Sequence, residues 1–588
     1  MDLMRARRQP YIDTVKRRTE WAFYFFFVWF LFLSYQLFNI QVRQHAHFKK
    51  QAARYHNRRI QVDAVRGILY DRHGTALTQN LPLKSVYADP SLIDDPAATA
   101  RQLAGPLRRS PQYLEKCLRR EGSFAWLRRK VDRQTEQAVR ALNLKGIDFV
   151  PETKRAYPLK SVAANLIGFT DIDGKGVEGL EQQLQETIAG KPGWVKAEVD
   201  ALGRIIPGTT HERVEAVDGH SVVLTIDARI QHLAETAIAK AHATYRAAGV
   251  SAVVLDPRTG EILALANRPT YDPNVPAESE TAERRNRCVT DLYEPGSTMK
   301  AITVAAALEE KAIRPTSLFH CPGSYPIGKR RIRCVVHAPY THGHGAQTIR
   351  GVLRESCNIG TAQIASQLGS RKLYRYIADF GFIGDTRSGL IGERRGSLTP
   401  PSTWAPIKQA NVSFGQGVSV TALQMAVAYG AIANGGKLMQ PYYIRRIEDG
   451  AGKVVQEYHP SVVRQVISKQ TADLLAKCLQ EVVEEGTGKP AQVEGYTVAG
   501  KTGSAQKVRE GGRGYAPGCF IASFIGFAPV SDPRIVCIVV VDEPKGSHWG
   551  STCAAPAFQE IVQGALWCMK VPPDRPVDLQ QTALGMQR

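Results

Sequence analysis

The sequence predicts a mixed α/β (α+β) fold, in which strands from both ends of one large domain form an antiparallel sheet with helices between them. Strand-like segments rich in β-branched residues occur at 251–255, 261–266, 521–527 and 534–541. The last two are joined by 529–533, which has proline at both ends and is typical of a hairpin. Helical patterns at 230–248 and 298–308 flank the early strands.

The N-terminal part of the chain predicts a membrane-spanning helix. Residues 21–42 carry no charge, and a helix of that length crosses a hydrocarbon core of about 30 Å. A buried core helix is the alternative, but uncharged apolar runs this long are rare in soluble domains, and the absence of a small-residue cleavage site favours an uncleaved signal anchor. Charge does not decide the orientation, since residues 1–20 and 41–60 each hold six Lys or Arg. We expect 1–20 to be a cytoplasmic tail, because a long C-terminal domain crosses the membrane despite its charge.

The remaining sequence predicts two extracytoplasmic modules and a tail. A chain of 588 residues exceeds the usual size of one hydrophobic core. The first module, 43–222, is rich in arginine and has short, interrupted periodic segments. The second module, 223–570, contains the sheet and helices described above, and we expect residues 571–588 to be disordered.

Three short motifs lie in one order within the second module. They are Ser297-Thr-Met-Lys300, Ser356-Cys-Asn358 and Lys501-Thr-Gly503. Each alone is weak evidence, since a helix-start serine, a turn or a solvated lysine explains it equally well. All three in order predict a serine acyltransferase whose nucleophile is activated by a lysine.

Ser297 is the better of two candidate nucleophiles. It opens the helical pattern 298–308, so Lys300 lies three residues along the same helix face. The second S-x-x-K match runs from Ser504 to Lys507 in a strand-like segment, where the two-residue period puts these side chains on opposite faces.

The two lysines suggest how the nucleophile is activated. A lysine acts as a general base only when desolvation or neighbouring positive charge lowers its pKa. Lys501 and the positive helix N-terminus would supply that field for Lys300. Ser356 would relay a proton between the lysine and the leaving amine, and Asn358 would hold a substrate amide.

The Lys-Thr-Gly-Ser segment predicts a site for a substrate carboxylate. Lys501, Thr502 and Ser504 would bind the carboxylate through charge and hydroxyl groups. Gly503 would let the backbone approach closely. The backbone N–H groups of Ser297 and Ser504 are the candidate oxyanion hole.

These motifs and further blocks upstream resemble the class B penicillin-binding proteins. The blocks are 66–74 (RGILYDRHG), 152–158 (ETKRAYP) leading to Gly168-Phe169, and 176–181 (GVEGLE). The resemblance covers about 60–565, and YEPGSTMK at 293–300 favours the division-specific FtsI type. It implies the penicillin-binding-protein transpeptidase fold shared with serine β-lactamases, with 43–222 as an elongated pedestal module of the dimerisation type.

The resemblance also implies a function, an inner-membrane D,D-transpeptidase that cross-links peptidoglycan at the division septum. Ser297 would attack the penultimate D-Ala carbonyl of a pentapeptide stem, expel the terminal D-Ala and pass the acyl group to an amine on a neighbouring stem. Penicillins would acylate the same serine, and no cofactor is implied. The implied partners are peptidoglycan stem peptides, β-lactams, an FtsW-type membrane glycosyltransferase and other divisome proteins.

Other classes stay open at this point. A β-lactamase shares the motifs but usually lacks a membrane anchor and a large N-terminal module. A β-lactam sensor needs several membrane spans and a cytoplasmic domain, for which 20 N-terminal residues leave no room. A non-catalytic scaffold would tolerate loss of Ser297 or Lys300, and both are present. Elongation-type and sporulation-type transpeptidases share the whole pattern.

The net charge of +21 and the pI near 9.5 are weak evidence about partners. They suit anionic lipid surfaces or acidic wall polymers, but we favour the alternative of a generally arginine-rich solvated surface. We expect no nucleic-acid partner, because the sequence carries a membrane anchor and no nucleic-acid-binding motif.

The ten cysteines are notable for a domain outside the reducing cytosol. Most occur singly in apolar contexts and are expected to be buried. Cys321 and Cys334 flank a turn-rich segment, and a disulfide between them would stabilise the fold by about 2–3 kcal/mol. Free thiols and a zinc site are the alternatives; His320, His337, His342 and His344 lie near, but their spacing matches no common zinc template. We favour the disulfide and expect no metal.

Overall fold

The computed structural model describes residues 2–198, 212–335, 342–509, 511 and 514–576. The chain forms two compact units. Unit 1 consists of Met1–Val65 and Gly190–Asp218, and unit 2 consists of Arg66–Ala189 and Gly219–Arg588. Most of the tail expected at 571–588 lies outside the described residues, which end at 576.

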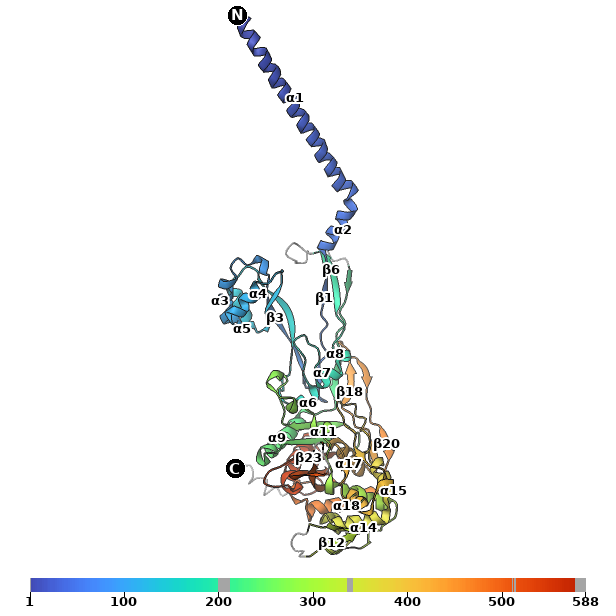
Figure 1. The fold of residues 1–588 in the computed structure, drawn as a ribbon. Coiled ribbons are helices and arrows are strands. Elements are labelled where there is room, and N and C mark those ends of the chain that lie inside the picture. Colours follow the sequence, from blue (N-terminus) through green and yellow to red (C-terminus); the bar gives the residue numbers. More distant parts are fainter. Residues whose placement is uncertain (1, 199–211, 336–341, 510, 512–513, 577–588) are drawn as a thin grey trace. The chain divides into compact units, whose positions relative to one another are not determined.

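Unit 1 begins with the long N-terminal helix (Figure 1). α1 spans Asp2–Phe38 and is followed by a π-helical turn, Asn39–Arg43, and by α2, His45–His56. The stretch Thr14–Arg43 has a mean hydropathy of 1.6, and none of its apolar window is buried. Trp21 is 74% exposed. A surface this apolar needs lipid around it, so the structure supports the predicted single membrane span by length and composition.

A three-stranded antiparallel sheet completes unit 1. Its order is β1-β6-β7, formed by Asn57–Val62, Gly193–Glu198 and Glu212–Val214. Val62 pairs with Gly193, and Trp194 pairs with Val214. The unit is therefore assembled from two segments that are far apart in the sequence.

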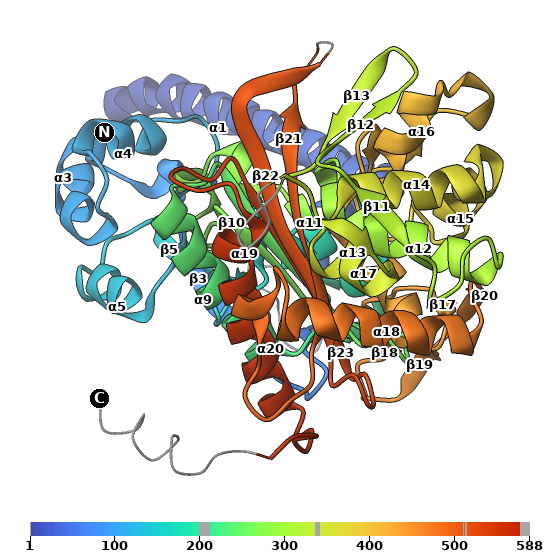
Figure 2. The ribbon, with the colours of Figure 1, turned by 90° about the horizontal axis from the view of Figure 1, so that it is seen from below.

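The centre of unit 2 is a five-stranded antiparallel sheet in the order β10-β9-β23-β22-β21 (Figure 2). Its strands are β9 (Gly249–Leu255), β10 (Ile262–Arg268), β21 (Ala499–Val508), β22 (Tyr515–Ala528) and β23 (Ile535–Asp542). β22 and β23 form the predicted hairpin, with Ala528 opposite Ile535. The early strand β9 pairs directly with the late strand β23, so the predicted fold class is confirmed.

Alternate side chains of this sheet face two separate hydrophobic cores. In β23, Val536 and Ile538 belong to one core, whereas Cys537 and Val539 belong to the other, as the two-residue period of a strand requires. The helices packed in the first core include α12 (Met299–Glu309), α14 (Asn358–Leu368) and α17 (Ala422–Ala433), and those in the second include α9 (Ala228–Tyr245) and α20 (Ala555–Cys568). The sheet is thus covered by helices on both faces (Figure 2).

The other described elements of unit 2 surround this sandwich. The helices are α3 (Pro96–Leu107), α4 (Pro111–Leu118), α5 (Arg133–Ala141), α6 (Ala164–Ile167), α7 (Gly179–Gln183), α8 (Gln185–Ile188), α10 (Thr281–Arg284), α11 (Arg287–Thr290), α13 (Ile349–Arg354), α15 (Ser370–Asp379), α16 (Pro406–Ser413), α18 (Lys469–Glu484) and α19 (Gly550–Cys553). The strands are β2 (Leu69–Tyr70), β3 (Gln79–Ala88), β4 (Ala125–Val131), β5 (Ile147–Ala156), β8 (Ser221–Leu224), β11 (Phe319–Cys321), β12 (Ser324–Ile327), β13 (Arg330–Arg333), β14 (Gly345–Gln347), β15 (Ser397–Leu398), β16 (Val418–Ser419), β17 (Lys437–Met439), β18 (Ile444–Glu448), β19 (Val454–Glu457) and β20 (Val462–Gln465).

The strand expected at the module boundary, β8, lies in the middle of a sheet. It pairs in parallel with β2, Leu69 opposite Val222, and antiparallel with β18, Ser221 opposite Glu448. This four-stranded sheet connects segments from both sides of residue 222. The module limits 43–222 and 223–570 stay a prediction.

The upstream blocks meet in a buried charge cluster. Glu181 is wholly buried and accepts hydrogen bonds from Arg66 Nε at 2.8 Å and Arg155 Nε at 2.7 Å. Arg66 also donates to the backbone oxygen of Glu181 at 2.9 Å. Each of the three blocks contributes one residue to this cluster. The two ion pairs of Glu181 therefore explain why these separated blocks lie together in the fold.

Replacing Glu181 with alanine is expected to lower the free energy of unfolding by about 3–5 kcal/mol, because two buried guanidinium groups lose their counter-charge. The shift of the urea midpoint of the detergent-solubilised chain measures this loss. Glu115→Ala is the matched control, since Glu115 forms an exposed pair with Arg119 within one helix. Its effect should stay within about 1 kcal/mol. Equal shifts for the two variants would contradict the role of the cluster.

Candidate active site

The candidate nucleophile lies at the start of α12. A 3-10 turn, Gly296–Thr298, leads directly into the helix, as the sequence predicted. Gly296 has a φ of +57°, a left-handed conformation that glycine adopts without strain. The fully buried Tyr429 donates a hydrogen bond from its hydroxyl to the Thr298 carbonyl oxygen at 2.8 Å. The Tyr429 hydroxyl therefore stabilises the turn that carries Ser297.

Lys300 joins the first motif to the second. Its side chain is fully buried, and its Nζ donates to Ser356 Oγ at 3.1 Å and also to the Ser356 carbonyl oxygen. The sequence placed Lys300 on the helix face beneath Ser297; the hydrogen bonds of the amine run to Ser356 instead. The lysine thus bridges α12 and the turn before α14.

Ser356 lies on the turn between α13 and α14, and Asn358 begins α14. Ser356 has a φ of +54°, which residues other than glycine adopt at a cost and which functional sites often retain. Cys357 caps α14, and its Sγ accepts a hydrogen bond from Gly360 N at 3.2 Å. Asn358 is the first helical residue, and its Nδ2 donates to the Arg333 carbonyl oxygen at 3.4 Å.

The third motif lies on β21, an edge strand of the five-stranded sheet. Lys501 is fully buried, with its Nζ 3.3 Å from Thr502 Oγ1, which in turn lies 3.1 Å from Thr487 Oγ1. A Cβ on Gly503 would lie 3.1 Å from Thr298 Cγ2 and only 2.4 Å from a side chain on β22. Glycine therefore lets β21 lie against the start of α12.

In the second S-x-x-K match, Ser504 and Lys507 each hydrogen-bond to other residues. The Ser504 hydroxyl accepts a hydrogen bond from Gly550 N at 3.1 Å. Lys507 donates instead to Asp542 and Glu543, each at 2.9 Å. This separation follows from the strand period, as the sequence predicted.

Burial lowers the pKa of both lysines. The pKa of Lys300 falls to about 8, chiefly because desolvation penalises the ammonium form, while nearby cysteine thiols oppose the change. The pKa of Lys501 falls well below its usual value, first through burial and then through the positive charge of Lys300. The sequence offered two causes for a lowered Lys300 pKa, desolvation and the positive charge of Lys501 and the helix N-terminus; in the structure burial is the main cause. An amine with a pKa of about 8 is mostly protonated at neutral pH, but it reaches the neutral, proton-accepting form that a general base requires far more readily than an ordinary lysine does.

A cavity of about 610 Å³ lies over these motifs. The predicted site residues that line it are Ser297, Ser356, Asn358, Thr502 and Ser504. Lys300 and Lys501 are fully buried and do not line it. Residues that are 207 positions apart, Ser297 and Ser504, thus share one wall of the same cavity.

Sequence reasoning missed several residues of this cavity. They are Val335, Glu355, Phe414, Gln416, Glu485, Thr487, Trp549 and Ser551. Gln416 lies between two glycines of left-handed conformation, Gly415 and Gly417, and that short glycine pattern was the available signal. The segment with Trp549 carries no pattern that separates it from an ordinary loop.

The structure does not contain the expected disulfide. Cys321 and Cys334 are both free thiols. Their sulfur atoms lie beside His344, which is one of the four histidines of the zinc alternative, and beside Cys357, which the sequence did not link to the pair. His337 lies outside the described residues.

Comparisons with known proteins agree with this geometry. The penicillin binding protein transpeptidase domain matches residues 250–563, and the penicillin-binding protein dimerisation domain matches 61–224. Stage V sporulation protein D of Bacillus subtilis is 36% identical over 94% of this chain and 86% of its own length. Peptidoglycan D,D-transpeptidase FtsI of Escherichia coli is 34% identical over 87% of this chain and 85% of its own length.

Solved structures show the same relation. Penicillin binding protein 3 of Mycobacterium tuberculosis, in complex with aztreonam, superposes with a TM-score of 0.67 at 28% identity, covering 88% of this chain and 99% of that chain. The match extends over both the dimerisation and the transpeptidase regions. With its catalytic motifs on one cavity and both family domains present, the chain belongs to the class B penicillin-binding proteins.

Proposed function

We propose that this protein is a penicillin-sensitive peptidoglycan D,D-transpeptidase that works through an acyl-enzyme on Ser297. The observation that carries the proposal is the buried Lys300 amine, whose pKa of about 8 and hydrogen bond to Ser356 join two motifs at the cavity lined by Ser297. The family membership and the FtsI relative support the same reaction.

Acylation begins with proton transfer from the Ser297 hydroxyl to the Lys300 amine. The Ser297 Oγ attacks the penultimate D-Ala carbonyl carbon, and the backbone N–H groups of Ser297 and Ser504 donate to the resulting oxyanion. The C–N bond to the terminal D-Ala then breaks. Ser356, 3.1 Å from the Lys300 amine, passes the proton on to the leaving nitrogen.

Substrate binding and deacylation use the other motif residues. The Thr502 and Ser504 hydroxyls bind the terminal carboxylate, Lys501 attracts it by its charge from behind Thr502, 3.3 Å from the Thr502 hydroxyl, and Asn358 holds the stem amide. The arriving carboxylate favours the charged form of Lys501 and so offsets the effect of burial on its pKa. An amine on a second stem peptide then attacks the ester, forms the cross-link and regenerates the Ser297 hydroxyl.

The acylation rate is expected to rise with pH. Because the Lys300 pKa is about 8, the neutral, proton-accepting amine is the minor form below that pH and the major form above it. Second-order acylation by a β-lactam, measured between pH 6 and pH 10, should therefore increase with a midpoint near pH 8 and level off above that pH. A flat profile would exclude Lys300 as the titrating base.

A direct assay tests the function. Purified full-length protein with peptidoglycan strands that carry pentapeptide stems should release D-Ala and form cross-linked stem dimers, and Ser297→Ala should do neither. A penicillin adduct that persists for many minutes separates a transpeptidase from a β-lactamase, which would deacylate quickly.

The cellular setting is proposed from the relatives. The single N-terminal apolar helix anchors the chain in the cytoplasmic membrane, with residues 1–20 inside the cell and the cavity outside. The likeness to FtsI favours action at the division septum. An FtsW-type membrane glycosyltransferase and other divisome proteins are the corresponding partners.

A role in sporulation is the second candidate. Stage V sporulation protein D matches a larger share of this chain than FtsI does. Depletion of the protein during imaging of a fluorescent fusion distinguishes the roles. Filaments with the fusion at mid-cell indicate division, normal growth with defective spores indicates sporulation, and rounded cells indicate elongation.

A further inference from the structure

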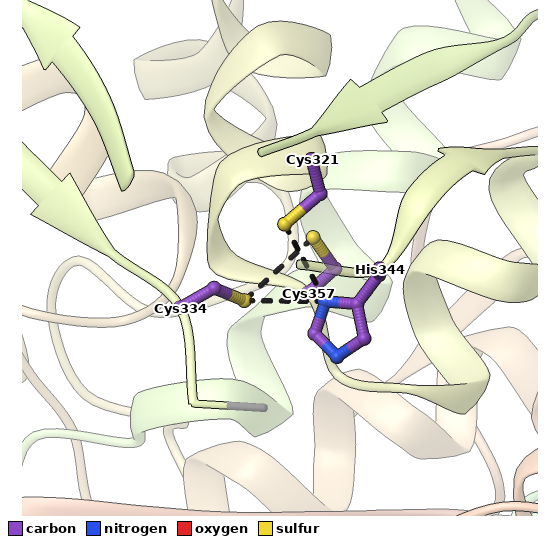
Figure 3. A group of neighbouring side chains, drawn as sticks. All are labelled: Cys321, Cys334, His344 and Cys357. Atoms are coloured by element: carbon purple, nitrogen blue, oxygen red, sulfur yellow. Dashed lines mark hydrogen bonds between the residues drawn. The ribbon is translucent and has the colours of Figure 1, made fainter. Parts of the chain in front are cut away.

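Three cysteines and one histidine converge beside the second motif (Figure 3). Cys321 ends β11, Cys334 follows β13, His344 precedes β14 and Cys357 caps α14. The side chains point toward one another, and their sulfur and nitrogen atoms all lie within 4.8 Å of each other. The acyl-transfer chemistry uses none of these four side chains.

Three distances within this group match those between the ligands of a tetrahedral metal site. Zn–S bonds of about 2.3 Å and Zn–N bonds of about 2.0–2.1 Å place tetrahedral ligands about 3.8 Å apart for two sulfurs and about 3.6 Å apart for sulfur and nitrogen. The Cys334 and Cys357 sulfurs are 3.8 Å apart. His344 Nδ1 lies 3.5 Å from both the Cys321 and the Cys334 sulfur.

The surroundings also suit a structural metal. Cys321, His344 and Cys357 are buried, with exposed fractions of 1%, 5% and 0%. Gly360 N donates to the Cys357 sulfur at the N-terminus of α14, a contact that stabilises negative charge on this sulfur once a metal ion displaces its proton. Three thiols that meet at one point cannot all pair as disulfides, whereas all three and the imidazole can bind one ion.

We propose that Cys321, Cys334, His344 and Cys357 bind one structural zinc ion. Three thiolates and an imidazole form a Cys₃His set, which suits zinc and closes the tetrahedron without an open position. Binding displaces three protons from the thiols and leaves a site of net charge −1. The ligands come from four segments, which explains why their sequence spacing fits no common zinc template.

The site would hold the second motif in place. Cys357 lies between Ser356 and Asn358, and the Lys300 amine donates to Ser356 Oγ at 3.1 Å. A zinc ion bound to Cys357 ties this turn to β11, β13 and β14 and supports the left-handed backbone of Ser356. This consequence rests on the proposed function, but zinc binding itself does not.

The test is made on the full-length protein purified in detergent without chelator. We expect one zinc ion per chain by elemental analysis. Exchange with Co²⁺ should give the intense visible bands of a tetrahedral ion and a thiolate-to-cobalt charge-transfer band. Cys334→Ala should abolish bound zinc and both cobalt signals. Chelation should lower the melting temperature of the wild-type protein and leave that of Cys334→Ala unchanged.

Two further variants test whether misfolding, rather than loss of a ligand, explains the loss of metal from Cys334→Ala. His344→Cys supplies a Cys₄ set and should keep the metal, with a stronger charge-transfer band. Cys478→Ala removes a fully buried cysteine outside the group and should keep zinc and the cobalt spectrum. Either of two results would overturn the proposal. One is a peptide that links Cys321 to Cys334 in a non-reducing digest, and the other is a wild-type protein that contains no zinc and shows no tetrahedral cobalt bands after Co²⁺ is added.

The acylation rate separates the zinc site from the proposed function. Zinc removal should slow acylation by a β-lactam, and added zinc should restore the rate. Bound zinc without any change in acylation would overturn the link to Ser356 while leaving the metal site intact. Absence of acylation in the zinc-loaded wild-type protein would instead contradict the proposed function.

Discussion

Replacing Ser297 with alanine is expected to abolish covalent labelling by a fluorescent penicillin. The loss should be complete, because the serine oxygen forms the bond to the acyl group and alanine offers no atom in its place. Intact mass after labelling, followed by peptide mapping of the wild-type protein, measures the effect and locates the adduct. The Ser297 turn is fixed by the Tyr429 hydrogen bond to Thr298, so the variant should keep its fold.

Ser504→Ala is the matched control for this experiment. Ser504 lines the same cavity and begins the second S-x-x-K match, but its partner Lys507 is bound to Asp542 and Glu543. Labelling of this variant should be slower and still detectable, since the lost hydroxyl contributes to carboxylate binding. An adduct mapped to Ser504 in the wild-type protein would refute the assignment of the nucleophile.

Replacing Lys300 with arginine is expected to lower the acylation rate by about 10²–10⁴-fold, the usual contribution of a general base. The substitution keeps a positive charge, but a guanidinium stays protonated and cannot accept the Ser297 proton. Burial lowers the lysine pKa to about 8, so the native amine reaches the neutral form and arginine does not. Stopped-flow acylation by a β-lactam provides the rate, and near-native acylation would exclude Lys300 as the base.

Lys501→Arg is the comparison for that result. Lys501 is also fully buried, but its proposed task is to bind a carboxylate, which a guanidinium also does. We expect weaker apparent binding of the β-lactam and a smaller loss in the acylation step than for Lys300→Arg. Circular dichroism of both variants checks that the buried substitutions leave the fold intact.

Much of the candidate site was predictable because its reactive residues occur in short sequence motifs with a fixed helical or strand spacing. A serine and a lysine three residues apart lie on one helical turn wherever the helix packs, and the structure places both at the start of α12. The two-residue period of β21 likewise separates Ser504 from Lys507 without any knowledge of the neighbouring strands. The cavity residues Thr487 and Trp549 were missed because each reaches the site from a loop with no such pattern.

Contacts over long sequence distances account for the expected disulfide that the structure does not contain, and for a cause that the sequence left open. The Cys321 and Cys334 pair suggested a disulfide because their separation suits a closed loop, but separation does not reveal that His344 and Cys357 meet them from other segments. Desolvation was one of two causes that the sequence offered for a low Lys300 pKa, and only the packing of the surrounding helices and strands shows that burial is the larger one.

The sequence by itself determined the membrane helix, the late hairpin, the three motifs and the family resemblance, because hydrophobic runs, strand alternation and helical spacing are local properties of the chain. Only the tertiary structure decided that β9 pairs with β23, that Lys300 donates to Ser356, and that four segments bring a Cys₃His set together. These contacts join residues far apart in the chain, and close packing of two cores around one sheet fixes them.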